Sequence, residues 1–265
     1  MKKEEVYIDE IVGYFQANQD RTWIFLDTET LGFQPEKHQM LEVAATAVKL
    51  NNAPSFDTLL NYHEKAKLLS VTRLRMSYPY KGKGLSYRDL LKMTKYGEPL
   101  KDRVYIEERE MLEQFFSFVE SFEDPILVAH NSSFDMRFLN GRHNVYFENK
   151  NPYDDYEVLD TLKIMRKYFT AFVTTESKRF KHRWLSDVEE QHILRMRQIR
   201  KTLQEKKGKR MSLKLGRVAN ALGLDDAGCH SAKFDVETLI AVTQVMLNLF
   251  NENYDKTVYT EKSFL

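Results

Sequence analysis

The chain has 265 residues, which is enough for one domain with a proper hydrophobic core or for two small domains. Its 42% hydrophobic and 30% charged residues are ordinary for a globular protein, and a net charge of +1 means that any signal for a polyanionic partner must be local. The single cysteine, Cys229, excludes an intramolecular disulfide framework and a cysteine-rich zinc site.

The N-terminal part of the chain favours a cytoplasmic location. No long apolar run follows Met1-Lys2-Lys3-Glu4-Glu5, so a signal peptide is not expected. No uninterrupted apolar run approaches the length that a membrane-spanning helix needs, so a membrane partner is not expected either. Residues 5–18 place apolar side chains at helical spacing, which predicts an amphipathic helix packed on a sheet.

Three strands are predicted next, in an antiparallel meander. The apolar run Trp23-Ile24-Phe25-Leu26 is too short for an independent helix and predicts a buried strand that ends in Asp27-Thr28-Glu29-Thr30. Residues 40–50 and 56–62 predict the second and third strands. Residues 64–103 are irregular and predict no regular element.

The remaining elements alternate between helices and short strands. Helices are predicted at residues 109–122, 135–145, 160–168, 212–222 and 235–250, and strands at residues 126–129 and 156–159. Asp160 and Ser212 are the expected caps of two of these helices. No internal repeat or low-complexity linker interrupts the chain, so residues 1–265 predict a single α/β domain with a five-stranded sheet flanked by helices.

Residues 173–210 predict a basic helical insertion within this domain. Between Lys178 and Arg210, twelve lysines and arginines stand against four acids, a local charge of +8 in a chain otherwise near −7. Basic clustering is the electrostatic footprint of nucleic-acid binding, although a solvated charged helix is the alternative interpretation. The cations expected to contact substrate phosphates are Arg195, Arg197, Arg200 and Lys201.

Acidic residues stand at the predicted end of one strand and near two predicted helix starts. Side chains alternate along a strand, so Asp27 and Glu29 point to the same side. Two buried carboxylates repel each other and resist ionisation, and a bound divalent cation with oxygen ligands removes both penalties. The alternative is a strand end that reaches water, with Thr28 and Thr30 in turn contacts.

Two later stretches favour the metal interpretation. His130-Asn131-Ser132-Ser133-Phe134-Asp135 follows a predicted buried strand and supplies a third acid. His230-Ser231-Ala232-Lys233-Phe234-Asp235 supplies a fourth acid at the start of a long apolar helix. Four acids and a histidine at strand ends and helix starts predict one shared metal site.

The order DxE, HNxxFD and HxxxxD resembles the DEDDh class of 3′→5′ exonucleases, which has a ribonuclease H-like fold. The resemblance extends roughly from Thr22 to Phe250. Within the class, the stretches from Leu159 to Arg166 and from Ser212 to Ile240 look most like the bacterial exonuclease that digests single-stranded DNA.

The resemblance implies a mechanism with two Mg²⁺ or Mn²⁺ ions. It implies that Asp27 bridges both ions, that Glu29 and Asp235 complete the site of the attacking water, and that Asp135 supports the second ion. His230 would be the general base, since the unperturbed pKa of a histidine suits proton removal near neutrality. On one regular helix His230 and Asp235 would diverge by about 140°, so His230 is expected in the preceding loop or a distorted first turn.

The resemblance also implies contacts with the terminal nucleotide. The expected set is Thr28, Thr30, Leu31, Gly32, Phe33, Asn131 and Phe134. Phe33 or Phe134 would stack on a base, with core packing as the alternative for Phe134. Core support is expected for His130, and a nucleophilic role for Cys229 is disfavoured because no orienting acid at triad spacing is evident.

The leading prediction is therefore a metal-dependent exonuclease that releases nucleoside monophosphates from the 3′ end of single-stranded DNA. An exoribonuclease is the first alternative. A catalytically silent nucleic-acid-binding module and a proofreading subunit that binds a polymerase or another replication protein are the others.

Overall fold

The computed structural model describes residues 11, 13–51, 55–67, 105–148, 151–167, 169, 194, 198–204, 211–224 and 231–252. The predictions for Arg195, Arg197, Cys229 and His230 lie outside the described residues, as does most of the basic insertion and of the irregular stretch 64–103. In the described part of the chain, no helix is both long and apolar enough to cross a membrane.

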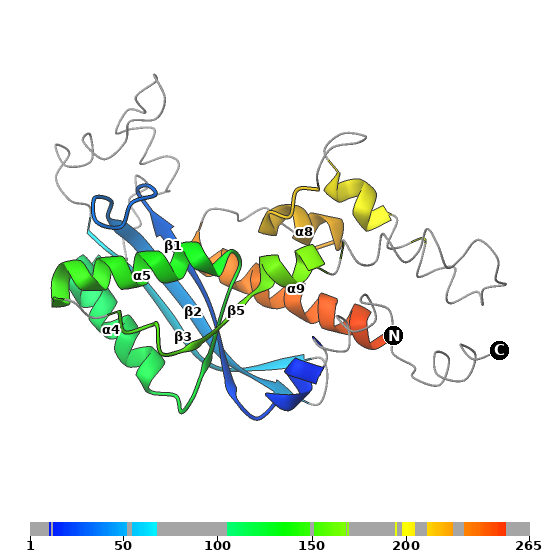
Figure 1. The fold of residues 1–265 in the computed structure, drawn as a ribbon, viewed down its shortest axis with the longest axis horizontal. Helices are drawn as coiled ribbons and strands as arrows, with labels where there is room; N and C mark the ends of the chain where they lie inside the picture. Colours follow the sequence, from blue (N-terminus) through cyan, green and yellow to red (C-terminus); the bar gives the residue numbers. More distant parts are fainter. Residues whose placement is uncertain are drawn as a thin grey trace, which may run out of the picture.

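Five strands form one mixed sheet in the order β3-β2-β1-β4-β5 (Figure 1). The strands are β1 (Thr22–Thr30), β2 (Met40–Asn51), β3 (Ser55–Lys65), β4 (Ile126–Ala129) and β5 (Glu157–Asp160). The first three pair antiparallel, whereas β4 runs parallel to β1 and β5 parallel to β4. The predicted meander and mixed five-stranded sheet are confirmed.

Helices cover both faces of the sheet (Figure 1). The long helices are α4 (Glu108–Glu120), α5 (Ser132–Phe147) and α9 (Ala232–Glu252), and α8 (Leu215–Ala221) is short. Residues 13–17, 161–167 and 198–203 are also helical. Helices α4 and α5 pack on one face, and α9 with α8 on the other.

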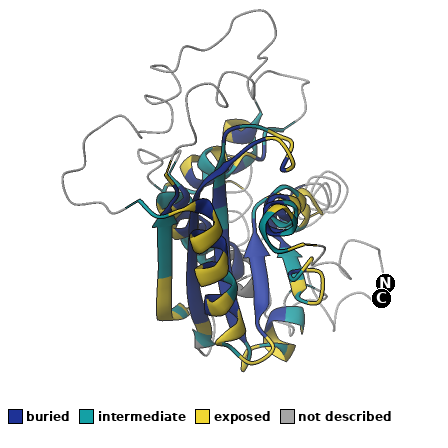
Figure 2. Cartoon of the chain, turned by 90° about the vertical axis from the view of Figure 1, so that its left-hand side faces the viewer, coloured by how far each residue is buried: buried dark blue, intermediate teal, exposed yellow. Residues whose placement is uncertain are grey.

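Alternate side chains of β1 pack into two separate hydrophobic cores. Trp23 and Phe25 are buried on the α9 face, whereas Ile24 and Leu26 are buried on the α4 and α5 face. Both faces of β1 are therefore apolar, which explains why its sequence is a continuous hydrophobic run rather than an alternating one. The buried central strands and the exposed outer helix surfaces are visible in Figure 2.

Three helix starts differ from the sequence prediction. Ser212 is not a cap, because α8 begins at Leu215 after Lys214, and the Ser212 amide instead donates to the Leu203 carbonyl at 3.0 Å. Helices α5 and α9 begin at Ser132 and Ala232, so Asp135 and Asp235 lie inside their first turns. Burial patterns place helix faces well but leave helix ends undetermined.

The predicted cap at Asp160 is confirmed. Its Oδ1 accepts hydrogen bonds from the amides of Leu162 and Lys163 at 3.0 and 3.4 Å. The same oxygen accepts the Asn131 amide at 3.1 Å, which ties the loop before α5 to the end of β5. One carboxylate therefore holds two neighbouring strand ends in place.

A buried ion pair joins α4, α5 and the start of β2. Arg142 donates from Nε and Nη2 to the two Glu108 oxygens, each at 2.7 Å, and from Nη1 to the Pro35 carbonyl at 2.8 Å. Glu108 also accepts the Met40 amide at 2.8 Å. Because the chain from Pro35 to Met40 follows the acids of β1, this pair anchors the rim of the acid cluster.

Replacing Glu108 with alanine should destabilise the protein by about 3–5 kcal/mol, since it leaves the Arg142 charge buried without its partner. Glu107→Ala is a matched control, because Glu107 pairs with Lys67 at 3.0 Å at the surface, and an exposed pair contributes about 0–1 kcal/mol. Urea denaturation measures both. Equal losses for the two variants would show that the buried pair does not anchor this region.

Candidate active site

Two of the four acids lie on one face of β1. Residues 23 and 25 face α9, so strand alternation carries Asp27 and Glu29 to that same face. Each is half-buried, and each belongs to the last residues of β1. The pairing with β2 shifts between Glu29 and Thr30, so the strand becomes irregular directly after the second acid.

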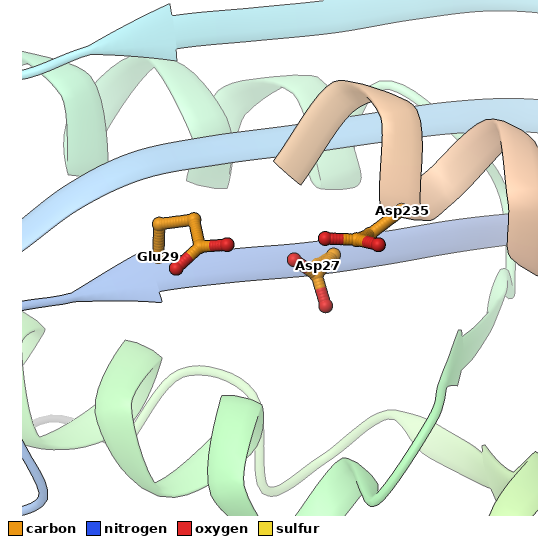
Figure 3. Close-up of side chains that lie close together, drawn as sticks. All are labelled: Asp27, Glu29 and Asp235. Carbon is orange, nitrogen blue, oxygen red and sulfur yellow. The ribbon is translucent and has the colours of Figure 1, made fainter. Parts of the chain in front are cut away.

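Asp235 reaches the same place from α9. This helix packs against β1 and β2, and Asp235 in its first turn points toward Asp27 (Figure 3). One carboxylate oxygen each from Asp27, Glu29 and Asp235 lies within 4.8 Å of the others. Residues more than 200 positions apart in sequence are thus brought to one point, as the motifs predicted.

Asp135 approaches from the opposite layer, through Thr28. The intervening residue Thr28 faces α5, and both its hydroxyl and its amide donate to Asp135 Oδ1, at 2.8 and 3.2 Å. Asp135 is buried with only 3% exposure. Thr28, predicted to contact substrate, therefore has its hydroxyl committed to holding the fourth acid beside β1.

Burial and mutual repulsion keep these acids from ionising easily. Burial, and then the negative charges of its acidic neighbours, hold the pKa of Asp27 well above its ordinary value. Burial first, and then the charge of Asp235, raises the pKa of Glu29 to about 7. Burial likewise raises the pKa of Asp135 to about 7, although the Thr28 hydrogen bonds oppose the shift.

The donor set fits a hard divalent cation. Carboxylate oxygens are the ligands that Mg²⁺ and Mn²⁺ prefer, and the described part of the cluster supplies no cysteine or histidine that would select zinc. A cation at Asp27, Glu29 and Asp235 would cancel the repulsion that raises their pKa values. The residues that would hold it are therefore the predicted ones, with Asp135 adjoining.

A buried cluster around Glu42 adjoins the site and was missed from the sequence. Glu42 lies opposite Glu29 in the register of β1 and β2, and is 1% exposed. It contacts His63 Nε2 at 2.6 Å and Lys65 Nζ at 3.1 Å, and accepts the Ser231 hydroxyl at 3.2 Å. Burial acts to raise the pKa of Glu42, but the two basic partners outweigh it and lower the pKa.

The Glu42 cluster has two consequences for the acids. The charge of Lys65 opposes the upward shift of the Glu29 pKa. The contact with Ser231 ties the residue before α9 to β2, and the Ser231 carbonyl accepts the Asp235 amide at 2.9 Å. Glu42, His63 and Lys65 stand on neighbouring strands, so only the strand register could have revealed them.

The loop after β1 presents one aromatic ring to solvent. Leu31 is buried at 3% exposure, whereas Phe33 is 72% exposed. Its ring lies against Phe134 in an edge contact, with centroids 6.3 Å apart. Arg137, which sequence analysis did not single out, donates to the Phe33 carbonyl at 3.2 Å and lies 5.8 Å from the Phe134 ring.

Gly32 and Thr30 have internal roles in this loop. A Cβ on Gly32 would come within 2.7 Å of the His38 ring, so only glycine fits there. The Thr30 hydroxyl donates to the Gly32 carbonyl at 2.8 Å, which matches the turn contact considered as the alternative. Phe134 is partly buried against Phe138, at a centroid distance of 4.9 Å, so its ring is shared between core and surface.

The loop before α5 places Asn131 at the surface and His130 inside. Asn131 adopts a left-handed conformation with φ 71° and is exposed. His130 Nε2 donates to the Leu213 carbonyl at 2.7 Å, and its Nδ1 faces the Thr161 hydroxyl at 3.1 Å. Burial lowers the pKa of His130, and both ring nitrogens have a neighbouring polar partner, consistent with the core support expected for it.

The described end of the basic insertion packs on the α9 face. Residues 198–203 are helical, as predicted for the insertion, and Ile199 and Leu203 are buried in that core. Arg200 is half-buried and Lys201 exposed. Their contact with phosphate stays a prediction.

Sequence comparison relates the chain to DNA polymerases. Residues 79–183, less than half of the chain and including the HNSSFD motif, match the family "DNA polymerase family B, exonuclease domain". The chain is 32% identical over 149 residues to "DNA polymerase III PolC-type" of Halalkalibacterium halodurans, a match that covers 56% of this chain and 8% of that protein. The Staphylococcus aureus protein of the same name is 26% identical over 155 residues, covering 58% and 9%.

Structural comparison relates it to exonuclease I. The structure of Escherichia coli exonuclease I with a dT13 oligonucleotide matches 90% of this chain and 43% of its own, at a TM-score of 0.54 and 15% identity. A moderately thermophilic exonuclease I from Methylocaldum szegediense matches 87% of this chain and 42% of its own, at a TM-score of 0.51 and 18% identity. The chain thus spans less than half of each matched protein.

The chain has the fold of the matched exonuclease I structures, and it carries an acid cluster at the end of β1. The predicted resemblance to 3′→5′ exonucleases is confirmed by the family match and the polymerase relatives, and the predicted fold by the exonuclease I structures. The chain is thus similar in sequence to the exonuclease domain of family B polymerases, over residues 79–183, and similar in fold to exonuclease I.

Without a divalent cation, the protein should lose stability as pH rises. The pKa values of Glu29 and Asp135 rise from 4.5 and 3.8 to about 7 on folding, so the folded state keeps protons that the unfolded chain has released. This stabilisation is complete below about pH 4 and is lost as pH rises through about 7. Thermal unfolding in a chelator should show it, since each kcal/mol shifts the melting temperature by about 2–4 °C.

Added Mg²⁺ should reverse the loss, with a larger rise in melting temperature at high pH than at low pH, because the cation replaces the protons. Asp27→Asn serves as the control, since it removes one of the repelling charges and should flatten the pH dependence in the chelator. A pH dependence unchanged by both Mg²⁺ and Asp27→Asn would contradict a cation site at these acids.

Proposed function

We propose that the chain is a metal-dependent 3′→5′ exonuclease that hydrolyses single-stranded DNA to nucleoside monophosphates. The observation that carries this proposal is the approach of Asp27, Glu29 and Asp235 to within 4.8 Å, with Asp135 held alongside by Thr28. The similarity to exonuclease domains supports the reaction class. Several matched structures of Escherichia coli exonuclease I are complexes with single-stranded DNA or a deoxyoligonucleotide, which supports DNA over RNA.

The four acids are proposed to hold two Mg²⁺ or Mn²⁺ ions, shared through Asp27. Such ions, when bound, activate a water and stabilise the charge that develops on the phosphate and leaving oxygen. The protein contributes rigidity. Thr28 fixes Asp135, the Glu42 cluster fixes the strand and helix beside Glu29 and Asp235, and the Glu108 pair fixes the loop beyond.

His230 is proposed as the general base. It directly precedes Ser231, which is bonded to Glu42, and α9 begins only at Ala232. The residue next to His230 is thus tied to the site, as the proposed role requires. A general base must reach the attacking water. The position of His230 next to Ser231 in the sequence supports such a role.

Phe33 is proposed to pack on the terminal base. Its exposed ring, backed by Phe134 and held by Arg137, offers a sequence-independent surface at the rim of the acid cluster. The side chain of the exposed residue Asn131 is proposed to contact the same nucleotide. Leu31 and Gly32 are proposed to contact the terminal nucleotide through their backbone and to shape the loop that carries Phe33.

Asp27→Asn and Asp235→Asn should each abolish release of nucleoside monophosphates from end-labelled single-stranded DNA, because each removes a ligand charge. His230→Ala should lower the rate about 10²–10⁴-fold, the usual contribution of a general base. Glu237→Gln is the matched control on α9, since the Glu237 side chain is 58% exposed and pairs with Lys233 at 4.0 Å. A blocked 3′ end should prevent digestion by the native protein.

Loss of rate in Glu237→Gln equal to that in Asp235→Asn would show a general effect on α9. Full activity after exhaustive chelation would exclude the metal-dependent mechanism.

Phe33→Ala should raise the KM for single-stranded DNA while leaving kcat within a few-fold, since a lost stacking contact costs about 1–3 kcal/mol of binding. Leu59→Ala removes another exposed apolar side chain, 46% exposed on β3, and should leave KM unchanged. Steady-state kinetics on homopolymers of different bases measures both. An unchanged KM for Phe33→Ala would remove Phe33 from the substrate site.

A proofreading exonuclease is the second candidate, favoured by the 32% identity to a PolC-type polymerase. A proofreading enzyme prefers a mismatched primer end in duplex DNA, whereas the leading proposal expects free single strands to be digested faster. The ratio of the two rates on matched sequences distinguishes the candidates.

A further inference from the structure

A cavity of about 640 Å³ lies between the end of β4, the helix at residues 161–167 and the segment that enters α8. The helix at residues 161–167 and α8 lie at the same end of the molecule (Figure 1). Pockets that bind small ligands typically measure about 300–1,000 Å³, so the cavity is large enough for a nucleotide. The acid cluster does not include any of its lining residues.

The lining of the cavity combines an apolar wall with two cations. Leu162, Met211 and Leu213 supply apolar surface, whereas Arg166 and Lys214 are exposed at its edge. No acidic side chain is among the described residues that line it. An unstacked base needs apolar or aromatic surface and its phosphates need cations, so this composition suits a nucleotide.

Hydrogen bonds within the protein give the cavity a fixed shape. His130, which lines it, donates to the Leu213 carbonyl at 2.7 Å and so joins the end of β4 to the segment before α8. Asp160 holds the Asn131 amide on one side and caps the helix that carries Arg166 on the other. The walls come from three parts of the chain and are tied together by buried polar groups.

The position of the cavity relates it to the acids and to the basic insertion. Asn131 lines it and directly precedes α5, whose first turn carries Asp135. Ser212, between the lining residues Met211 and Leu213, bonds to Leu203 at the described end of the basic insertion. The cavity therefore adjoins both the proposed catalytic helix and the most positively charged stretch of the chain.

We propose that this cavity binds one internal nucleotide of the single-stranded substrate, upstream of the 3′ end, with its base on the apolar wall and its phosphates beside Arg166 and Lys214. The inference rests on the proposed function and adds a second anchoring point to it. Such an anchor holds the strand in register after the terminal nucleotide leaves.

The experiment uses the full chain with Asp27→Ala, so that bound DNA stays intact. Single-stranded oligonucleotides carry 2-aminopurine, a fluorescent base analogue, at successive positions from the 3′ end. One internal position should change its fluorescence on binding, and Arg166→Gln with Lys214→Gln should remove that change. Loss of two phosphate contacts should also reduce the slope of log affinity against log salt by about 1.4.

Lys49→Gln with Lys67→Gln is the matched control. It removes the same charge from two exposed lysines, one on β2 and one shortly after β3, and neither lines the cavity. The control pair should keep both the fluorescence profile and the salt slope of the Asp27→Ala parent.

Other outcomes overturn the inference in distinguishable ways. Oligonucleotide binding with the same profile in both double variants would remove the cavity from the strand path and leave the proposed function standing. Displacement of the internal signal by free deoxyadenosine monophosphate, with no loss of oligonucleotide affinity, would make it a free-nucleotide site instead. Absence of any oligonucleotide binding in the parent would overturn the proposed function together with this inference.

Discussion

Repulsion among four carboxylates at the end of one strand is the constraint on which the rest of the structure depends. Asp27, Glu29, Asp135 and Asp235 come from three elements in three layers, and each of the first three has a raised pKa because burial and like charge oppose ionisation. A free chain would separate them. They stay together because each is carried by an element whose hydrophobic face is packed elsewhere.

Three polar contacts around the site hold different parts of it in place. Thr28 restrains Asp135, Glu42 connects β2 to the residue before α9, and Glu108 with Arg142 anchors the chain beyond β1. The contacts of Thr28 and Glu108 are buried and that of Ser231 is partly buried, so removing one partner would leave an uncompensated polar group. These contacts therefore stabilise the elements that carry the acids, and they oppose the destabilising repulsion among the acids.

The proposed substrate path follows from the same arrangement. Phe33 stands at the rim formed by the loop after β1, and the loop before α5 separates Asp135 from the cavity edged by Arg166 and Lys214. A strand whose terminal phosphodiester lies at the acids could meet an aromatic ring at its end and cations further along. Few contacts of this kind depend on base identity, so the proposed path would accept strands of any sequence.

The sequence by itself determined the strand order along the chain, the amphipathic faces and the four acids, because hydrophobic period and motif spacing are local properties. Alternation along β1 also predicted that Asp27 and Glu29 share a side. Only the tertiary structure placed Glu42 opposite Glu29 and in contact with His63 and Lys65, since these neighbours depend on the register of three strands. The same holds for Thr28 on Asp135, for the helix starts and for the cavity, which arise where distant segments meet and which no local pattern encodes.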